Sequence, residues 1–302
     1  MSKVEWIAVD WGTSNLRAWA IGMNNEVVAE LNSDRGMGTL RSDEFEAVLV
    51  HLLDPYLGDE CMPVLCCGMV GAKQGWSEAT YAKTPCAPGA VETITQIASE
   101  DIRISVSILP GVMQTSPADV MRGEETQIAG FIAENPRFDG TLCLPGTHTK
   151  WVQISAEEIV SFRTFMTGEM FALLSQRSVL RHGVAGDEWS NDAFIEAVED
   201  SMSSPQQLAS RLFGIRAEGL VRDQSQGDAK ARLSGLLIGQ ELAGARGYWL
   251  GQDVALIGDP NLTELYNAAL EKQGVIARSL GGAEMTLAGL SAAYKATKDE
   301  PS

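Results

Sequence analysis

The sequence predicts an α/β protein built of two lobes, and three observations support this. The chain has 302 residues, which exceeds the size at which a single hydrophobic core usually stops growing. Short apolar runs alternate with amphipathic segments, as expected for sheets covered by helices. One order of segments (three strands, helix, strand, helix, strand, helix) occurs twice, with no proline- or serine-rich linker between the halves. We therefore expect lobes at 1–136 and 137–302 that pack around a cleft.

The first half opens with three antiparallel strands. The apolar run from Trp6 to Val9 predicts a buried strand, and tight turns join it to strands at 16–21 and 26–31. Ser42 can cap the helix that follows. The remaining elements expected here are a strand at 64–67, a long ordered loop at 68–88, a helix at 90–98, a strand at 104–109 and a helix at 124–134.

The second half repeats this plan with a helical insertion at about 187–250. Within the insertion, Ser204 and Pro205 predict the start of a helix, with serine as the cap and proline in the first turn. The other elements expected here are strands at 141–144, 150–154, 159–165, 254–257 and 275–278, and helices at 168–182, at 261–272 and from 282 onward.

The composition excludes several classes of partner. The net charge of −17 repels phosphate backbones and anionic lipids, so we expect neither nucleic acid nor membrane surfaces as partners. The sequence contains no run of 18 uninterrupted apolar residues, so we expect no membrane span. Residues 1–6 contain no basic segment followed by an apolar run, so we expect no signal peptide and a cytoplasmic location. The five cysteines lack Cys-x-x-Cys spacing and are interpreted as reduced thiols, and the three scattered histidines predict no zinc site.

The first candidate phosphate-binding segment is Asp10-Trp11-Gly12-Thr13-Ser14, at the end of the first strand. Glycine allows the backbone to approach an anion, and successive N–H groups with the Thr13 and Ser14 hydroxyls can donate to phosphate oxygens. Asp10 is suited to holding Mg²⁺ through water. The alternative interpretation is an ordinary polar hairpin turn.

A similar segment begins the second half. Gly146, Thr147, His148, Thr149 and Lys150 follow another four-residue apolar strand and precede a further strand. Two glycine-threonine hairpins, one per lobe, could hold a polyphosphate, and Lys150 could contact it or be a solvated strand lysine. A strand that ends at Gly258 and leads into a helix is typical of a nucleotide site and of αβ units in general.

These features, in this order, resemble the actin-like ATPase superfamily, which includes hexokinases and sugar kinases. The likeness narrows to the 2-dehydro-3-deoxygalactonokinase family, runs from residue 4 to about 170, and is looser from 230 to the end. The segments that carry it are 9–17, Gly75-Trp76 before Tyr81, 122–126, 144–151 and Thr167-Gly168-Glu169. The resemblance implies two ribonuclease H-like lobes, each a mixed five-stranded sheet with helices on both faces, and an ATP cleft between them. It also implies ATP and Mg²⁺ as cofactors.

The sequence departs from the superfamily pattern twice. Leu144-Pro145 stands before Gly146, where an aspartate is usual, and Asp259 follows Gly258 in place of a second glycine. Because of the first departure, the sequence does not establish that a second carboxylate assists the metal. The second departure leaves the adenine contacts open.

The resemblance places the catalytic base at the start of the helix at 124–134. A carboxylate there benefits from the helix N-terminus and stays ionised near neutrality, ready to accept a proton from the attacking hydroxyl. Glu124 and Glu125 are the candidates, and Glu124 is preferred. Ordinary acidic capping of the helix is the alternative.

The implied substrate, 2-dehydro-3-deoxy-D-galactonate, is a sugar acid phosphorylated on its terminal (6-) hydroxyl in D-galactonate catabolism. Arg122 and Arg35 are candidates for binding its carboxylate, because a guanidinium can do so bidentately. Gln74, Trp76 and Tyr81 would contact the sugar, or the aromatic rings could form a loop core.

Three competing interpretations remain open at the level of the sequence. The same fold could phosphorylate another acceptor, such as 2-keto-3-deoxygluconate, a hexose or pantothenate. It could also belong to an actin-like regulatory protein or to a phosphatase that attacks polyphosphate. The oligomeric state is open as well, with a homodimer as one alternative.

Overall fold

The computed structural model describes residues 3–299, which form two compact units. The first comprises Met1–Phe138, Ser155–Ser161 and Gly282–Ser302, and the second comprises Asp139–Ile154 and Phe162–Gly281. The boundary near 138 lies close to the expected 136, but the closing helix belongs to the first unit instead of the second. The prediction of no signal peptide rested on residues 1–6, of which Met1 and Ser2 lie outside the described residues.

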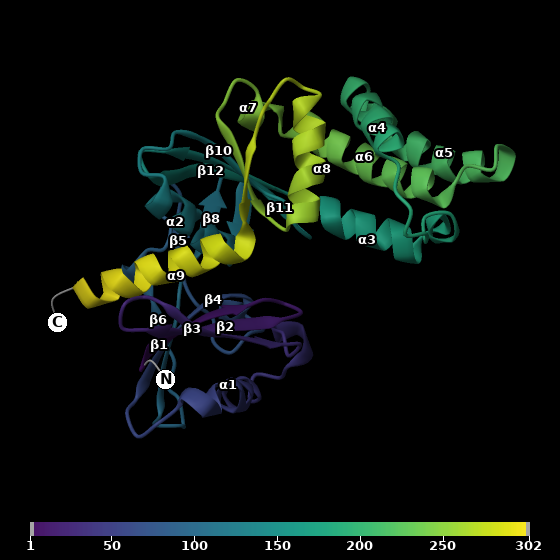
Figure 1. Ribbon diagram of the computed structural model, residues 1–302. Helices are drawn as coiled ribbons and strands as arrows, with labels where there is room; N and C mark the ends of the chain where they lie inside the picture. The colour runs from purple at the N-terminus through teal and green to yellow at the C-terminus, as the bar shows by residue number, and fades with distance from the viewer. Residues whose placement is uncertain (1–2, 300–302) are drawn as a thin grey trace. The chain divides into compact units, whose positions relative to one another are not determined.

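The first unit is organised around a mixed sheet (Figure 1). Within the described residues its order is β3-β2-β1-β4-β7-β6, with β1, β4 and β7 parallel and the other pairs antiparallel. The strands are β1 (Val4–Trp11), β2 (Leu16–Gly22), β3 (Val27–Ser33), β4 (Met62–Gly68), β6 (Thr95–Gln96) and β7 (Ile104–Ile108). The prediction of five strands missed the two-residue β6.

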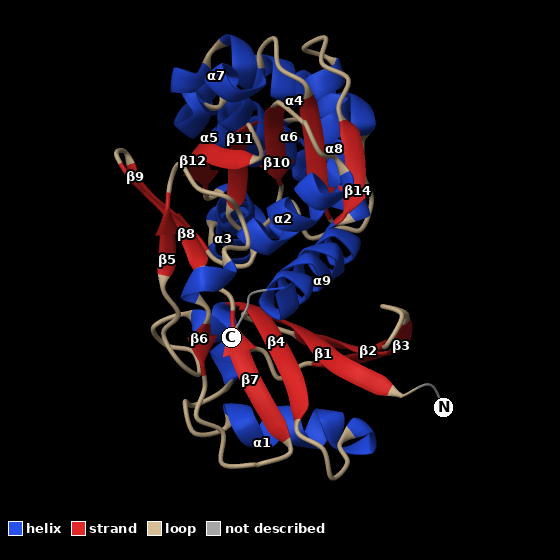
Figure 2. Cartoon of the chain, turned by 90° about the vertical axis from the view of Figure 1, so that its left-hand side faces the viewer, coloured by secondary structure: helices blue, strands red, loops and turns tan. Residues whose placement is uncertain are grey.

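Alternation along β1 explains why helices cover both faces of this sheet. Ile7 and Val9 pack with α1 (Phe45–Leu53), whereas Trp6 and Ala8 pack with α9 (Gly282–Asp299). Because successive strand side chains point to opposite faces, a continuous apolar run serves two cores. Figure 2 shows α1 and α9 on opposite sides of β1, β4 and β7.

Two glycines allow α9 to cross α2 (Glu124–Glu134) at short range. A Cβ on Gly130 would collide with the Met285 carbonyl oxygen, and one on Gly289 would collide with the Thr126 carbonyl oxygen. The absence of both side chains lets the two backbones touch. The N-terminus of α2 is thereby fixed on the sheet.

A small sheet combines one strand inside the long loop expected at 68–88 with two strands at 111–121, where no element was expected. It contains β5 (Tyr81–Lys83), β8 (Gly111–Thr115) and β9 (Ala118–Met121). The helix expected at 90–98 is wrong: the segment forms a 3₁₀ turn at Val91–Thr93 and then β6. Val91 and Ile94 pack against a core of the first unit without an α-helix, so apolar spacing alone was misleading.

The second unit repeats the strand order of the first. Its sheet runs β12-β11-β10-β13-β14 in the described chain, with β10, β13 and β14 parallel. The strands are β10 (Gly140–Leu144), β11 (Thr149–Ser155), β12 (Glu158–Phe165), β13 (Val254–Gly258) and β14 (Arg278–Gly281). The predicted class, an α/β protein of two lobes that are each built on a mixed sheet, is confirmed.

The helices of the second unit gather around α6, which is buried along much of its length (Figure 1). The α4 backbone approaches α6 at Gly235 and Gly239, where a Cβ would crowd the carbonyl oxygens of Phe194 and Val198. The helices are α3 (Thr167–Arg177), α4 (Asn191–Ser203), α5 (Leu208–Val221), α6 (Gln226–Gly244), α7 (Arg246–Trp249) and α8 (Pro260–Glu271).

Several predicted boundaries are wrong. Glu44, not Ser42, precedes α1. Ser204 and Pro205 do begin a helical turn, the 3₁₀ turn Pro205–Gln207, but the Ser204 side chain does not cap it. The helix expected to reach His182 ends at Arg177, and the strand expected at 275–278 begins at Arg278. The 3₁₀ turns are Met37–Thr39, Asp54–Tyr56, Met69–Gly71, Val91–Thr93, Val179–His182 and Pro205–Gln207.

No helix within residues 3–299 is long and apolar enough to cross a membrane. All five cysteines are free thiols.

Candidate functional site

In the first unit, the carboxyl ends of β1 and β4 meet the N-terminus of α2. Gly68 ends β4 with φ +88°, and a Cβ there would lie 2.8 Å from the Trp11 carbonyl oxygen and 3.3 Å from Asp10 Oδ1. Gly123 precedes α2 with φ +107°, and its Cβ would lie 3.3 Å from the Gly68 Cα. Only glycine adopts such backbone angles at low cost. These glycines bring the start of α2 beside Asp10.

Asp10 is half-buried at this edge, where the Cys67 thiol lies 3.9 Å from Oδ1. Burial raises the pKa of Asp10, Arg17 opposes the shift, and the negative charge of Glu124 adds to it. Two mutually repelling carboxylates form a set of hard oxygen donors that a divalent cation would stabilise. Asp10 is a hard oxygen donor suited to Mg²⁺, although no cluster of three or more His, Cys, Asp or Glu suited to a metal occurs within residues 3–299.

The two glutamates that begin α2 have different environments. Glu125 is 1% exposed; its carboxylate accepts the Gly123 N–H at 2.8 and 2.9 Å and the Thr126 hydroxyl at 3.3 Å. Burial, followed by the charge of Glu124, raises the pKa of Glu125 to about 7. Glu124 is only partly buried, and its carboxylate accepts the Arg122 N–H at 3.1 Å. Glu124 has more side-chain surface for contact with a substrate.

Arg122 is a buried cation whose hydrogen bonding is incomplete. Its side chain is 9% exposed; Nη2 donates to the Ala79 carbonyl at 2.8 Å, while Nε and Nη1 have no hydrogen-bond partner among the described residues. The guanidinium carbon lies 4.2 Å from the centroid of the Tyr81 ring. A Cβ on Gly71 would lie 2.9 Å from Nη1, so glycine leaves room for the group. Such a cation is suited to an anion supplied by a ligand.

The first glycine-threonine hairpin is held by the segment that follows β3. Met37 N–H donates to the Gly12 carbonyl at 3.0 Å, and Gly38 N–H donates to the Thr13 carbonyl at 2.8 Å. The Thr13 and Ser14 side chains remain exposed. Their hydroxyls are free to contact an anion on a turn whose backbone is fixed.

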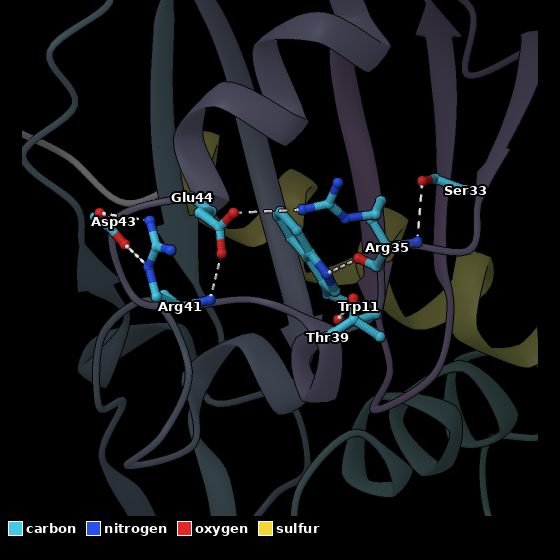
Figure 3. Close-up of polar contacts among 8 residues, drawn as sticks. Trp11, Ser33, Arg35, Thr39, Arg41, Asp43 and Glu44 are labelled. Carbon is cyan, nitrogen blue, oxygen red and sulfur yellow. Dashed lines mark hydrogen bonds and ion pairs between the residues drawn. The ribbon is translucent and has the colours of Figure 1, made fainter.

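Arg35 lies beside this hairpin, but its charge is already paired. The Trp11 indole N–H donates to the Arg35 carbonyl at 3.0 Å, while the Arg35 guanidinium lies 3.6 Å from the Glu44 carboxylate (Figure 3). An exposed guanidinium beside a carboxylate is a weaker anion site than a buried one without a partner. The structure therefore favours Arg122 over Arg35 for a substrate carboxylate.

The predicted sugar-contacting loop is divided among different environments. Trp76 stacks on Phe45 with ring centroids 6.2 Å apart, so it belongs to the packing of α1 on the sheet. Gln74 is exposed, and Tyr81 supports Arg122. Tyr81 is thus the member of this group that the structure joins to Arg122.

In the second unit, the glycine-threonine hairpin abuts the start of α3. A Cβ on Gly168 would collide with the Gly146 carbonyl oxygen, and Glu169 N–H donates to the Thr147 carbonyl at 2.9 Å. The Glu169 carboxylate lies 2.6 Å from Nε2 of His148. Thr147 and His148 are exposed, whereas the start of α3 packs against the backbone of this turn.

Thr149 and Lys150 are buried, so their side chains do not lie at the exposed surface of the hairpin. The Thr149 hydroxyl is buried and pairs with the Tyr266 hydroxyl at 3.0 Å. The Lys150 side chain is buried, and its ammonium donates to the His148 carbonyl at 3.2 Å. Thr149 thus faces the interior, and Lys150 contacts the backbone of the hairpin.

A cavity of about 260 Å³ extends from this hairpin between α3, α6 and α8. Apolar and aromatic side chains predominate in its lining, and the end of β13 lies close by: a Cβ on Gly258 would be 3.3 Å from the Pro145 carbonyl oxygen. The lining residues are Gly146, Thr167, Gly168, Phe171, Trp189, Lys230, Ser234, Leu237, Ile238, Leu262, Leu265 and Tyr266. A concave apolar pocket with a few polar groups suits a flat aromatic ligand.

Sequence analysis missed Glu241, Tyr266 and the lining of this cavity as site residues. Glu241 is a buried carboxylate in α6 that accepts hydrogen bonds from Trp151 and Tyr266. The signal that could have found it is an acidic residue inside the apolar stretch Leu236–Leu242. Its partners come from remote segments, so spacing along the chain could not identify them.

Comparison with known proteins gives a consistent result across nearly the whole chain. The family model described as 2-keto-3-deoxy-galactonokinase matches residues 10–293. "Probable 2-dehydro-3-deoxygalactonokinase DgoK1" of Rhizobium meliloti (strain 1021) is 40% identical over 295 residues, 96% of each chain. The 2-dehydro-3-deoxygalactonokinase of Escherichia coli (strain K12) is 34% identical over 289 residues, 94% of this chain and 96% of that one.

A solved structure extends the likeness to three dimensions. A crystal structure of a candidate 2-dehydro-3-deoxygalactonokinase from Sinorhizobium meliloti matches with a TM-score of 0.92 and 40% identity, covering 98% of this chain and all of that chain. The repeated lobes, the paired glycine-threonine hairpins and the carboxylates at the start of α2 thus occur in a chain with close relatives over its full length. This chain belongs to the 2-keto-3-deoxy-galactonokinase family.

Proposed function

We propose that this protein transfers the γ-phosphoryl group of ATP to the terminal (6-) hydroxyl of 2-dehydro-3-deoxy-D-galactonate, in D-galactonate catabolism. Membership of the family supports the reaction. The observation that carries the proposal is Arg122, a buried guanidinium with two unpartnered nitrogens beside the glutamates of α2. A small acceptor that carries a carboxylate would complete this arrangement.

Glu124 is the proposed general base. It accepts the proton of the 6-hydroxyl while the hydroxyl oxygen forms a bond to the γ-phosphorus and the bond to the leaving ADP oxygen breaks. Glu125 supports it by accepting the Gly123 N–H and so holding the turn that precedes α2. Its side chain is too buried to reach a substrate directly.

Arg122 binds the carboxylate of the sugar acid in this proposal. Each of its unpartnered nitrogens, Nε and Nη1, can donate to a carboxylate oxygen, and the Tyr81 ring holds the guanidinium plane by a cation–π contact. A neutral hexose offers no charge at this position and leaves the guanidinium unpaired. Arg122 would therefore select acids over neutral sugars.

Each unit by itself offers candidate contacts for the nucleotide. Thr13 and Ser14 in the first unit, and Gly146 with Thr147 in the second, can donate to phosphate oxygens. The cavity beside Gly146 takes the adenine ring. Asp10 would hold Mg²⁺ through water, and the ion would neutralise charge on the phosphates. Cytoplasmic location belongs to the same proposal; the homodimer stays a prediction, and the molar mass in solution tests it.

A coupled ADP-release assay tests the proposal. ATP and Mg²⁺ are supplied with 2-dehydro-3-deoxygalactonate, its gluconate epimer, galactose or pantothenate, one acceptor at a time. We expect turnover with the galactonate compound, and we expect Arg122→Met to raise the KM for it at least tenfold with little change in the KM for ATP. Galactose as the best acceptor, or an unchanged KM for the acid in Arg122→Met, would refute the proposal.

A further inference from the structure

Glu241 is the most completely hydrogen-bonded buried carboxylate described in the second unit. Its side chain lies on α6 and is 1% exposed. Oε1 accepts the Trp151 indole N–H at 2.8 Å, and Oε2 accepts the Tyr266 hydroxyl at 2.9 Å and the Thr167 hydroxyl in a short contact. Each of these donors comes from a different element, namely β11, α8 and the first residue of α3.

The same contacts reach the proposed nucleotide cavity. Thr167 and Tyr266 both line that cavity, and Tyr266 also pairs with Thr149 in β11. Thr167 is followed by Gly168 and Glu169, whose backbones contact the Gly146-Thr147 hairpin. One carboxylate thus links two walls of the cavity with the strand and helix that carry the hairpin.

The chemistry of the partners indicates why a carboxylate occupies this position. An indole N–H can only donate, and an ionised carboxylate accepts several hydrogen bonds at once. A buried charge is retained only where such bonds replace its hydration. If the carboxylate were removed, three buried donors would lose their shared acceptor, and α3, α8 and β11 could shift independently.

We propose that Glu241 is a positioning residue for the nucleotide: it fixes Thr167 and Tyr266 at the cavity walls and, through α3, the backbone of the second glycine-threonine hairpin. This inference rests on the proposed binding of ATP at this cavity. It also gives a role to the Thr167-Gly168-Glu169 segment, which the catalytic proposal leaves without one. Glu241 itself does not line the cavity, so it acts through its partners.

The test is binding of Mg²⁺-AMPPNP by calorimetry, together with separate KM values for ATP and for the sugar acid. Glu241→Ala is expected to raise the Kd of AMPPNP and the KM for ATP about tenfold, since the walls lose their common acceptor. The KM for the sugar acid should change less than about twofold. Glu241→Gln keeps the shape and an acceptor for Trp151, so it should restore the Kd to within about threefold of the wild-type value.

Ser201→Ala is the matched control. Ser201 is also buried against α6 and donates to the Leu236 carbonyl at 2.8 Å, but it does not line the cavity. This variant should lower stability without changing the Kd of AMPPNP. Equal weakening by Ser201→Ala and Glu241→Ala would overturn the inference, as would a Glu241→Ala protein with wild-type affinity or a failure of glutamine to restore binding.

If Glu241→Ala does not fold, the Kd of AMPPNP for Trp151→Phe tests the inference instead. It removes one donor from a residue outside the cavity lining, and a Kd unchanged from wild type would overturn the inference. AMPPNP binding is measured without an acceptor, so an error about the sugar acid leaves this test intact. A wild-type protein that binds no AMPPNP would instead refute the proposed function.

Discussion

At the scale of single residues, the first turn of α2 separates two adjacent glutamates by their surroundings. Glu125 faces inward and accepts the Gly123 N–H, while Glu124 is partly exposed and close enough to Asp10 for their charges to interact. A general base must reach the proton that it removes. Burial therefore distinguishes the two residues, of which the sequence analysis preferred Glu124.

We expect Glu124→Gln to lower kcat about 100- to 1,000-fold with little change in the Kd of AMPPNP, because the amide cannot accept the proton. Steady-state kinetics and calorimetry on the same preparation would measure both quantities. Glu134→Gln, at the exposed end of α2, is the control and should keep full activity. A larger loss of kcat in Glu125→Gln, at unchanged thermal stability, would assign the base to Glu125.

The residues of this site were predictable to different degrees for physical reasons. Asp10, Thr13 and Glu124 stand at the ends of strands and at a helix start, so local pattern and family resemblance located them. The sequence analysis also proposed Arg122, but only the fold shows that two of its nitrogens are unpartnered. Glu241 acquires its partners from three remote elements, which no local pattern encodes.

At the scale of elements, the crossing of α2 and α9 depends on the absence of two side chains. We expect Gly130→Ala and Gly289→Ala each to lower the free energy of unfolding by roughly 3 kcal/mol, because the added Cβ would strike a backbone carbonyl of the other helix. Urea unfolding at constant pH measures the change.

Gly214→Ala provides the comparison for that prediction. Gly214 lies within α5, and a Cβ there would meet nothing within 4 Å. Alanine favours helix over glycine, so this variant should gain about 0.5–1 kcal/mol. Destabilisation of the same size at all three positions would show that backbone contact at the crossing is not the cause.

The elements that sequence located correctly have strong periodic or continuous apolar patterns. β1, β10 and α2 are of this kind, and α2 begins and ends at the predicted residues. The failures are short elements: β6 has two residues, and β8 and β9 have five and four. Such segments depend on tertiary pairing more than on their own composition.

At the scale of the whole molecule, the repeated order of segments was the most informative feature of the sequence. It predicted two halves with the same plan of elements, and apart from β6 the two sheets do share one strand order. It did not predict that the closing helix belongs to the first unit. That assignment follows from its glycine contact with α2 and from its packing on β1 and β4, which the order of segments does not reveal.

Each unit also contains a buried glutamate whose titration contributes to the stability of the chain. Burial raises the pKa of both Glu125 and Glu241 from 4.5 to about 7. Between these values the folded state holds a proton that the unfolded state has released. Stability from each group is therefore fully present below about pH 4.5 and is lost as the pH rises through about 7, by roughly 3 kcal/mol per group.

We expect glutamine at either position to remove that group's share of the pH dependence. Relative to wild type, Glu125→Gln and Glu241→Gln should each become more stable by roughly 3 kcal/mol between pH 5 and pH 8, because glutamine does not ionise. Urea unfolding at both pH values measures this difference, in which contributions from other titrating groups cancel. A flat difference for Glu125→Gln or Glu241→Gln would mean that the carboxylate ionises as easily in the folded chain as in the unfolded one, so that its hydrogen bonds offset the whole cost of burial.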